Sequence, residues 1–137
     1  MVRPAILHIQ LDAHSGLPVY RQVMDQIRCY AASGALRPGA QLPSIRELAR
    51  ALAVNPATIV KAYTELQHEG LLEIKQGKGA FLAESAPTLP ARQVRRVLAQ
   101  LARALAVRAA QMGADPQAVL DAVRGEMERL RHERDRD

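Results

Sequence analysis

The sequence predicts a mainly α-helical fold with one small β-hairpin, and two observations carry this prediction. Apolar residues recur every three or four positions in five separate stretches, which is the period of a helix. One short stretch, 72–75, alternates apolar and polar residues, is followed by the glycine-rich turn 76–79 and returns as a second strand at 80–82. We therefore expect three helices, a β wing and a two-helix C-terminal tail, in that order.

The first helix should begin at Pro18, where the apolar period becomes helical, and end at Ser33-Gly34. Before it, residues 6–12 alternate, with apolar residues on one side and polar residues on the other. That period of two predicts a short, half-exposed strand at a sheet edge. Its apolar residues are Leu7, Ile9 and Leu11.

The second and third helices are separated by a very short link, Ala53-Val54. Ser44 is a favourable N-cap, and Glu47 three residues later completes a capping box, in which each side chain satisfies a free backbone N–H. Asn55 is an N-cap for the third helix, and Pro56 suits its first position because proline has no N–H to leave unpaired. Both helix starts are thus specified locally.

The chain divides in two after the hairpin. Two prolines in 86–90 predict a linker, so we expect one domain over 1–86 and a linker with a tail over 87–137. Within the tail, Gly113 and Asp115-Pro116 should end one helix and start the next. The charged end, 131–137, is expected to be frayed or disordered.

Composition favours a soluble cytoplasmic protein with a polyanionic partner. The net charge is +5, although residues 1–86 hold nine Lys or Arg against seven Asp or Glu, so the excess is small there. No apolar run reaches the roughly 18 to 20 residues of a membrane span, and the N-terminus does not resemble a signal peptide. Cys29 is the single cysteine, expected to be a small filler rather than a redox sensor.

Catalysis and metal binding are not predicted. His8, His14, His68 and His132 lack the spacing of metal ligands, and Cys29 has no second cysteine beside it. The sequence contains no nucleophile elbow, phosphate loop or Ser/His/Asp pattern. We therefore expect neither an enzyme nor a cofactor.

A supporting helix, two helices joined by a tight turn and a two-stranded hairpin form the order of a winged helix-turn-helix. The third helix leaves a polar end off its apolar stripe, and that end could enter a DNA major groove. Small residues Pro56 and Ala57 allow a close backbone approach, Thr58 could donate to a base or phosphate, and Lys61 could neutralise a phosphate. Two lysines, Lys75 and Lys78, lie at the tip of the predicted wing.

Four motifs make residues 17–82 resemble the GntR family of regulators. They are Leu-Pro-Ser-Ile-Arg-Glu-Leu-Ala at 42–49, Asn-Pro-Ala-Thr-Ile at 55–59, Glu-Gly-Leu at 69–71 and Lys-Gln-Gly-Lys-Gly at 75–79. The resemblance implies that Ser44 and Arg46 start a helix that crosses the DNA, with Arg46 contacting a base or phosphate. It also implies that the third helix recognises bases and that the wing around Gly77 meets the minor groove.

Pro56 and Val60 depart from the family pattern, because many members carry arginine at these two positions. Asn-Pro-x-Thr, together with a tail of only two helices, resembles the short-tailed YtrA-like branch. From a tail of about 50 residues we expect none of the large effector or aminotransferase-like domains that the resemblance implies for other branches.

The expected function is that of a transcription regulator, expected to be a repressor, which binds double-stranded DNA. Its expected DNA contacts are Ser44, Arg46, Asn55, Pro56, Ala57, Thr58, Lys61, Lys75, Gln76, Gly77 and Lys78. Alternatives stay open: Arg46 and Arg50 as solvated surface charges, the wing lysines as protection of a sheet edge, and the whole domain as a protein-interaction module or a double-stranded RNA binder.

The tail is expected to form a homodimer, because two helices alone cannot bury the apolar stripe that each presents. The expected dimerisation residues are Val94, Leu98, Leu101, Leu105, Met112, Val119, Val123, Met127 and Leu130. A two-fold dimer predicts an inverted-repeat operator. The alternative is a tail that folds back onto its own subunit.

Overall fold

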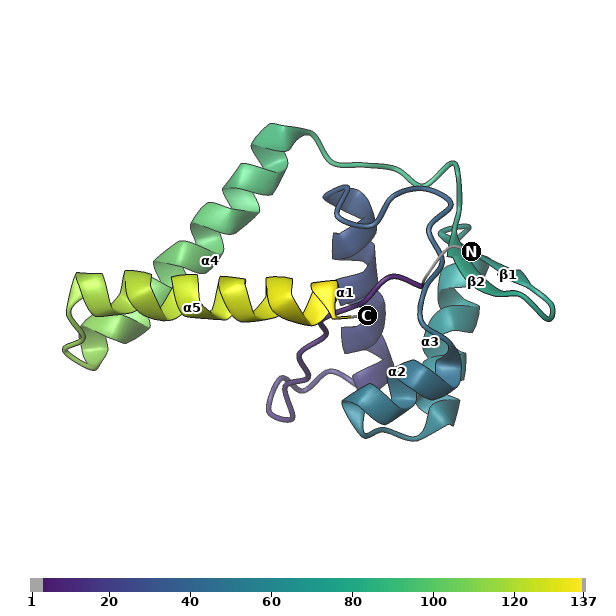
Figure 1. The fold of residues 1–137 in the computed structure, drawn as a ribbon, viewed down its shortest axis with the longest axis horizontal. Coiled ribbons are helices and arrows are strands. Elements are labelled where there is room, and N and C mark those ends of the chain that lie inside the picture. The colour runs from purple at the N-terminus through teal and green to yellow at the C-terminus, as the bar shows by residue number, and fades with distance from the viewer. Residues whose placement is uncertain (1–3, 137) are drawn as a thin grey trace. The chain divides into compact units, whose positions relative to one another are not determined.

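The structure is a computed structural model that describes residues 4–136, and these residues form the predicted mainly helical fold with a small wing (Figure 1). The chain divides into two compact units, one that ends at Leu89 and one that begins at Pro90. The elements are α1 (Val19–Ala32), α2 (Ile45–Leu52), α3 (Pro56–His68), β1 (Leu72–Lys75), β2 (Gly79–Leu82), α4 (Ala91–Gln111) and α5 (Pro116–Asp135).

The core of the N-terminal unit lies among α1, α2, α3 and the hairpin. α3 is its centre, because four of its side chains at helical spacing are buried against the neighbouring elements. These are Ile59, Ala62, Tyr63 and Leu66. Val23 and Ile27 from α1, Leu48 from α2, and Leu72 and Leu82 from the two strands complete the same cluster. One face of α3 is thereby fixed inward, and the opposite face stays free.

The helix starts follow the predicted N-caps, but the Glu47 side chain does not accept from the Ser44 N–H, so only half of the predicted capping box forms. Ser44 Oγ accepts a hydrogen bond from the Glu47 N–H at 3.0 Å, and Asn55 Oδ1 accepts one from the Ala57 N–H at 2.9 Å. In the second unit, Asp115 caps α5 in the same way. These bonds satisfy backbone donors that the first turn of a helix leaves unpaired, which is why the sequence locates the starts well.

The prediction of a strand over 6–12 is wrong. The segment is extended, with Leu7 buried, but its backbone bonds to side chains of α1 and not to another strand. The N–H groups of residues 8, 10 and 12 donate to Tyr30 Oη, Gln26 Oε1 and Gln22 Oε1 at 2.8, 2.9 and 2.7 Å. Four residues advance about 6 Å along a helix, and two residues advance about 6.6 Å along an extended chain. Every second N–H of the segment therefore lies opposite every fourth side chain of α1.

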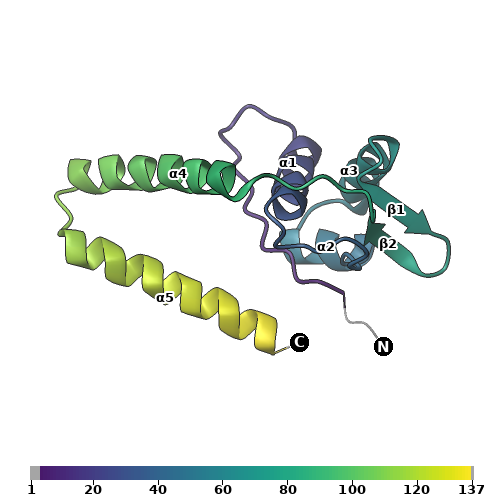
Figure 2. The same cartoon turned by 90° about the horizontal axis from the view of Figure 1, so that it is seen from above.

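The wing is an antiparallel hairpin, paired from Leu72 with Leu82 to Lys75 with Gly79. It protrudes from the N-terminal unit (Figures 1 and 2). On its other side, β2 bonds to the segment that precedes α2: the Leu42 N–H donates to the Ala80 carbonyl and the Leu82 N–H to the Ala40 carbonyl, each at 2.8 Å. The wing is thus anchored next to the start of α2.

The C-terminal unit is a helical hairpin of α4 and α5. The two helices meet near their connecting turn, where Ala109 is buried, and diverge from there (Figure 2). α5 continues to Asp135, so the prediction of a frayed or disordered end over 131–137 is wrong for its described part. Arg134 lies in the last turn, where a cation interacts favourably with the helix dipole.

The two remaining observations concern Cys29 and the length and apolarity of the helices. Cys29 is exposed on α1, so its expected place as a small packing residue is also wrong. Among the helices of the described chain, none has the length and apolarity that crossing a bilayer requires.

Candidate nucleic-acid interface

The turn between α2 and α3 depends on a left-handed alanine. Ala53 has φ 55° and ψ 45°, and the Ala53 and Val54 N–H groups donate to the Arg50 and Ala49 carbonyls at 3.2 and 3.0 Å. This conformation ends α2 abruptly and lets α3 begin at Pro56. Alanine adopts it at a cost of about 1–2 kcal/mol relative to the right-handed form, so the surrounding packing must impose it.

Tyr63, in the middle of α3, holds that helix against the start of α2. Its hydroxyl donates to the Pro43 carbonyl at 2.7 Å, immediately before the N-cap of α2. Burial raises the pKa of the Tyr63 phenol well above its ordinary value, and the negative charge of Glu47 adds to the rise. The hydroxyl therefore stays protonated and acts as a permanent donor that fixes α2 against α3.

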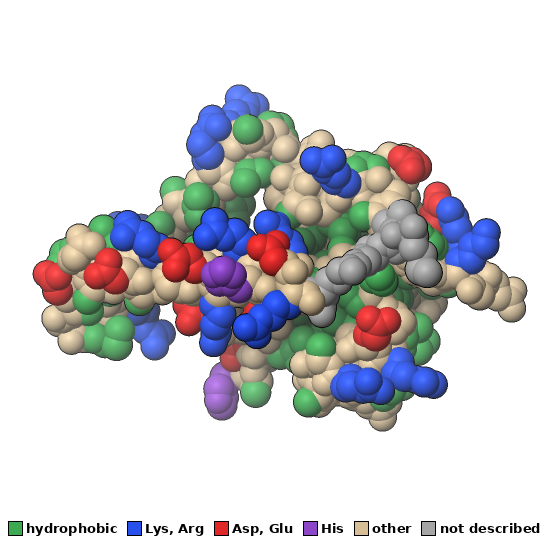
Figure 3. All heavy atoms as spheres, viewed as in Figure 1, with side chains coloured by type: hydrophobic (Ala, Val, Ile, Leu, Met, Phe, Trp, Pro, Cys, Tyr) green, Lys and Arg blue, Asp and Glu red, His purple; other side chains and the backbone are tan. Residues whose placement is uncertain are grey.

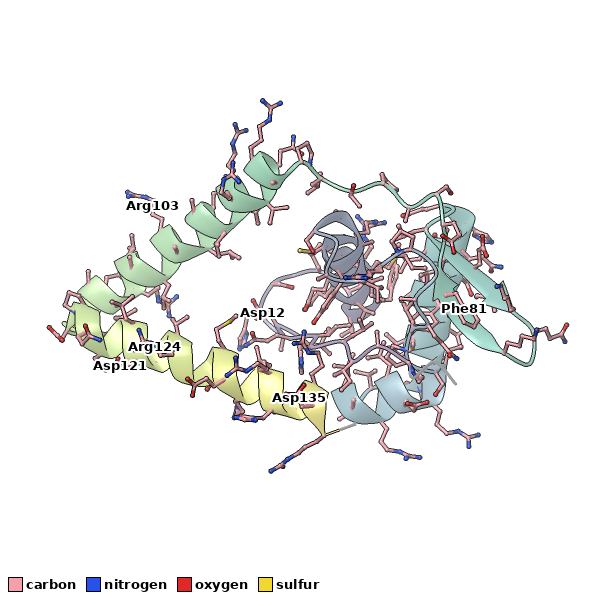
Figure 4. All side chains as sticks on the ribbon, turned by 45° about the horizontal axis from the view of Figure 1, so that its top comes forward. Asp12, Phe81, Arg103, Asp121, Arg124 and Asp135 are labelled. Atoms are coloured by element: carbon pink, nitrogen blue, oxygen red, sulfur yellow. The ribbon has the colours of Figure 1, made fainter. Side chains whose placement is uncertain are left out.

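Two exposed cations of the site lie on α2, one in its first turn and one in its last. Arg46 and Arg50 are both exposed, on the side of α2 opposite the buried Leu48 and Ala49. Basic side chains protrude over α2 in the space-filling view (Figure 3), and long nitrogen-tipped side chains extend away from it in Figure 4. An arginine in this position has the reach and the fork of donors that suit a guanine edge or a phosphate.

The outward face of α3 is small and apolar over its first two turns. Ala57 is exposed, Thr58 is half-buried, and Val60 is 45 % exposed. Lys61, the only cation among Pro56–Tyr63, lies with its ammonium 4.1 Å from the centre of the Tyr20 ring. The lysine thus makes a cation–π contact with Tyr20 of α1, and it remains exposed on α3.

The wing turn is closed by the Lys78 N–H, which donates to the Lys75 carbonyl at 2.9 Å, with Gly77 between them at φ 77°. Glycine adopts this φ without strain. Lys75 Nζ lies 4.9 Å from the centre of the Phe81 ring on β2, a residue labelled in Figure 4. Gln41 Nε2 donates to the Lys78 carbonyl at 3.0 Å and ties the wing to the segment before α2. Both lysines are exposed.

The predicted contact residues thus occupy three adjacent elements of one unit: the start of α2, the start of α3 and the wing turn. Sequence reasoning missed the roles of three residues that shape this surface. Tyr20 contacts Lys61, Gln41 bonds to the wing, and Tyr63 fixes α2 against α3. Val60, which the sequence marks as a departure from the family pattern, is exposed on α3 outside its apolar stripe.

An ion-pair cluster lies at the other end of α3 and adds no free charge to this surface. Arg28 of α1 bonds to both carboxylate oxygens of Glu69 and to Asp25 Oδ1. The Glu69 hydrogen bonds raise the pKa of Arg28, and the same bonds lower the pKa of Glu69. Because these side chains are more than a third exposed, the cluster contributes at most about 1 kcal/mol to stability.

Comparison with known proteins gives the family. The family model described as bacterial regulatory proteins, gntR family, matches residues 19–82, which span α1 to β2. The chain is 41 % identical to YtrA from Sulfolobus acidocaldarius, described as a GntR-family transcription factor, with a TM-score of 0.52 over 70 % of this chain and 97 % of that one. This chain belongs to the GntR family.

Two further matches are a YtrA repressor, which agrees with a YtrA-like GntR protein, and an operator-binding domain. The HTH-type transcriptional repressor YtrA of Bacillus subtilis is 42 % identical over 80 residues, 58 % of this chain and 62 % of that protein. The DNA-binding domain of AraR, solved in complex with operator ORX1, is 32 % identical with a TM-score of 0.51, over 56 % of this chain and 96 % of that one. The match spans about three fifths of the Bacillus YtrA sequence. These relatives are transcription regulators and not enzymes.

Proposed function

We propose that this GntR-family chain is a transcriptional repressor that binds an inverted-repeat operator as a homodimer. The observation that carries the proposal is the start of α2, α3 and the wing presented together by one rigid core, with Arg46 and the wing lysines exposed on them. The AraR domain, which matches 56 % of this chain, was solved in complex with operator DNA. The fold supports DNA binding here because these three elements have the order that places a helix in the major groove.

The likeness to named repressors supports the direction of regulation. The Bacillus relative is called a repressor, and a dimer that covers a promoter would exclude RNA polymerase from it. In transcription from a promoter that contains the bound site, added protein should reduce the transcript, and an increase would contradict repression.

The tail supports the dimer part of the proposal. Leu98 and Leu101 are each 64 % exposed on α4, and Met112 is 75 % exposed after it. Met127 on α5 is 63 % exposed. A row of exposed leucines and methionines at helical spacing is unfavourable in water, by about 25 cal/mol per Å² of apolar surface, and a second copy of the same hairpin would cover it.

The DNA part is tested by selecting duplexes from a random pool with the full-length protein. Affinity is then measured for a selected duplex and for a shuffled duplex of equal composition, at two salt concentrations. We expect tight binding that prefers the selected duplex. The logarithm of the association constant should fall linearly with the logarithm of the salt concentration, because phosphate contacts release counterions. Equal binding to both duplexes at physiological salt would contradict the proposal and favour a protein-interaction module.

A further inference from the structure

Over Pro56–Tyr63, the first two turns, the outward face of α3 lacks Arg, Asn and Gln, three of the side chains that usually distinguish guanine and adenine. Bidentate base recognition uses Arg or Lys for guanine and Asn or Gln for adenine. Within Pro56–Tyr63, all of which the structure describes, no Arg, Asn or Gln occurs, and Lys61 lies over the Tyr20 ring. The preceding Asn55 uses its side-chain oxygen to cap the helix.

Val60 is the largest exposed apolar side chain of this face. The buried stripe of α3 passes through Ile59, Tyr63 and Leu66, whereas Ala57 and Val60 lie one turn apart on exposed surface. The isopropyl group of Val60 is 45 % exposed, and it is the one large apolar side chain that α3 exposes among the described residues. It also lacks polar atoms, so its only specific use against DNA is contact with another methyl group.

The one apolar group that DNA presents in the major groove is the C5-methyl of thymine. We propose that Val60, with Ala57 beside it, determines specificity by contacting thymine methyl groups in each half-site. This inference rests on the proposed function, since it assumes that α3 enters the major groove. Hydrogen-bond contacts are assigned to Arg46 of α2 and to Asn55 and Thr58 at the start of α3. Val60 and Ala57 therefore supply shape and apolar contact.

Uracil provides a direct chemical test, because it keeps every hydrogen-bonding group of thymine and lacks only the C5-methyl. The probe is the duplex selected by the wild-type protein, resynthesised with uracil in place of thymine at one position at a time. We expect at least one thymine in each half-site at which uracil weakens binding about fourfold, the fold-change that corresponds to the loss of one methyl-sized apolar contact.

The Val60→Ala variant links this methyl to its protein partner. It should bind the thymine duplex about fourfold more weakly than wild type, and uracil at the responsible position should weaken it no further, which is the non-additivity expected of two groups in contact. Val107→Ala is the matched control, because Val107 is 43 % exposed on α4 and lies away from its apolar stripe. This control should keep the full uracil effect.

Two results would overturn the inference while leaving the proposed function intact. In the first, the protein binds its selected duplex specifically, yet uracil has no effect at any thymine. In the second, Val60→Ala retains the full uracil effect, which would assign the methyl contact to another residue. Failure of the selection to enrich any sequence would overturn both the proposed function and this inference. The uracil scan with wild-type protein needs no variant, so a folding defect in Val60→Ala would leave the first result decisive.

Discussion

Replacing Tyr63 by phenylalanine should destabilise the N-terminal unit by about 1–3 kcal/mol at neutral pH. The side chain is 1 % exposed and its hydroxyl donates to the buried Pro43 carbonyl at 2.7 Å. Phenylalanine keeps the packing but leaves that carbonyl unpaired, and the range reflects the typical cost of an unsatisfied buried acceptor. For a unit of this size, melting should occur roughly 5–20 °C lower.

The same substitution should change the alkaline dependence of stability. Burial raises the pKa of Tyr63 in the folded protein, whereas the unfolded phenol titrates near 10.0. Above that pH the unfolded state loses a proton that the folded state keeps, so wild-type stability falls as pH rises. The Tyr63→Phe variant lacks this loss, and its deficit relative to wild type should shrink by about 1.4 kcal/mol at pH 11.

Urea unfolding followed by circular dichroism at pH 7, 10 and 11 measures both effects. Tyr20→Phe is the control, because half-buried Tyr20 contacts Lys61 through its ring face, which phenylalanine also provides. Equal stability of Tyr63→Phe and wild type at pH 7, or a deficit that does not shrink by pH 11, would refute the assigned role of the Tyr63 hydroxyl.

The other predictions concern the turn between α2 and α3, the DNA interface and the C-terminal tail. Ala53→Gly should stabilise the fold by up to about 1 kcal/mol in urea unfolding, because glycine adopts positive φ without strain, and a destabilised variant would contradict this. Arg46→Ala should weaken operator binding by about 1–3 kcal/mol and relax preference at one base pair. Lys78→Ala should weaken binding to all duplexes to the same degree and reduce the slope of log affinity against log salt concentration. If neither Arg46→Ala nor Lys78→Ala changes DNA binding, the assigned interface is wrong. Truncation after Pro90 should leave a folded monomer with operator affinity roughly 10²–10⁴-fold lower, whereas an unfolded fragment would favour a tail that completes the core.

Local signals explain why much of the fold is predictable from the sequence. Ser44 and Asn55 cap their helices through their own side chains, and Gly77 supplies the positive φ of the wing turn, so each boundary depends on residues close in the chain. The apolar stripe of α3 likewise follows from spacing alone.

The errors and omissions involve interactions between residues far apart in sequence. Alternation over 6–12 indicates an extended backbone, but only the tertiary structure brings Gln22, Gln26 and Tyr30 alongside it in place of a strand. The left-handed Ala53 is imposed by packing against the intrinsic preference of alanine. The contact of Lys61 with Tyr20 was not foreseen, because it depends on how α1 crosses α3, and the contact of Lys61 with a phosphate stays a prediction.

The central claim is that two copies of this chain bind one inverted-repeat operator. Sedimentation velocity of the full-length protein, alone and with the selected duplex at micromolar concentration, tests it most directly. We expect a dimer in solution and two chains on each duplex. Footprinting of the same duplex should show two half-sites about 10 base pairs, or roughly 34 Å, apart. A monomer both free and on DNA, or a selected site without two-fold symmetry, would contradict the claim.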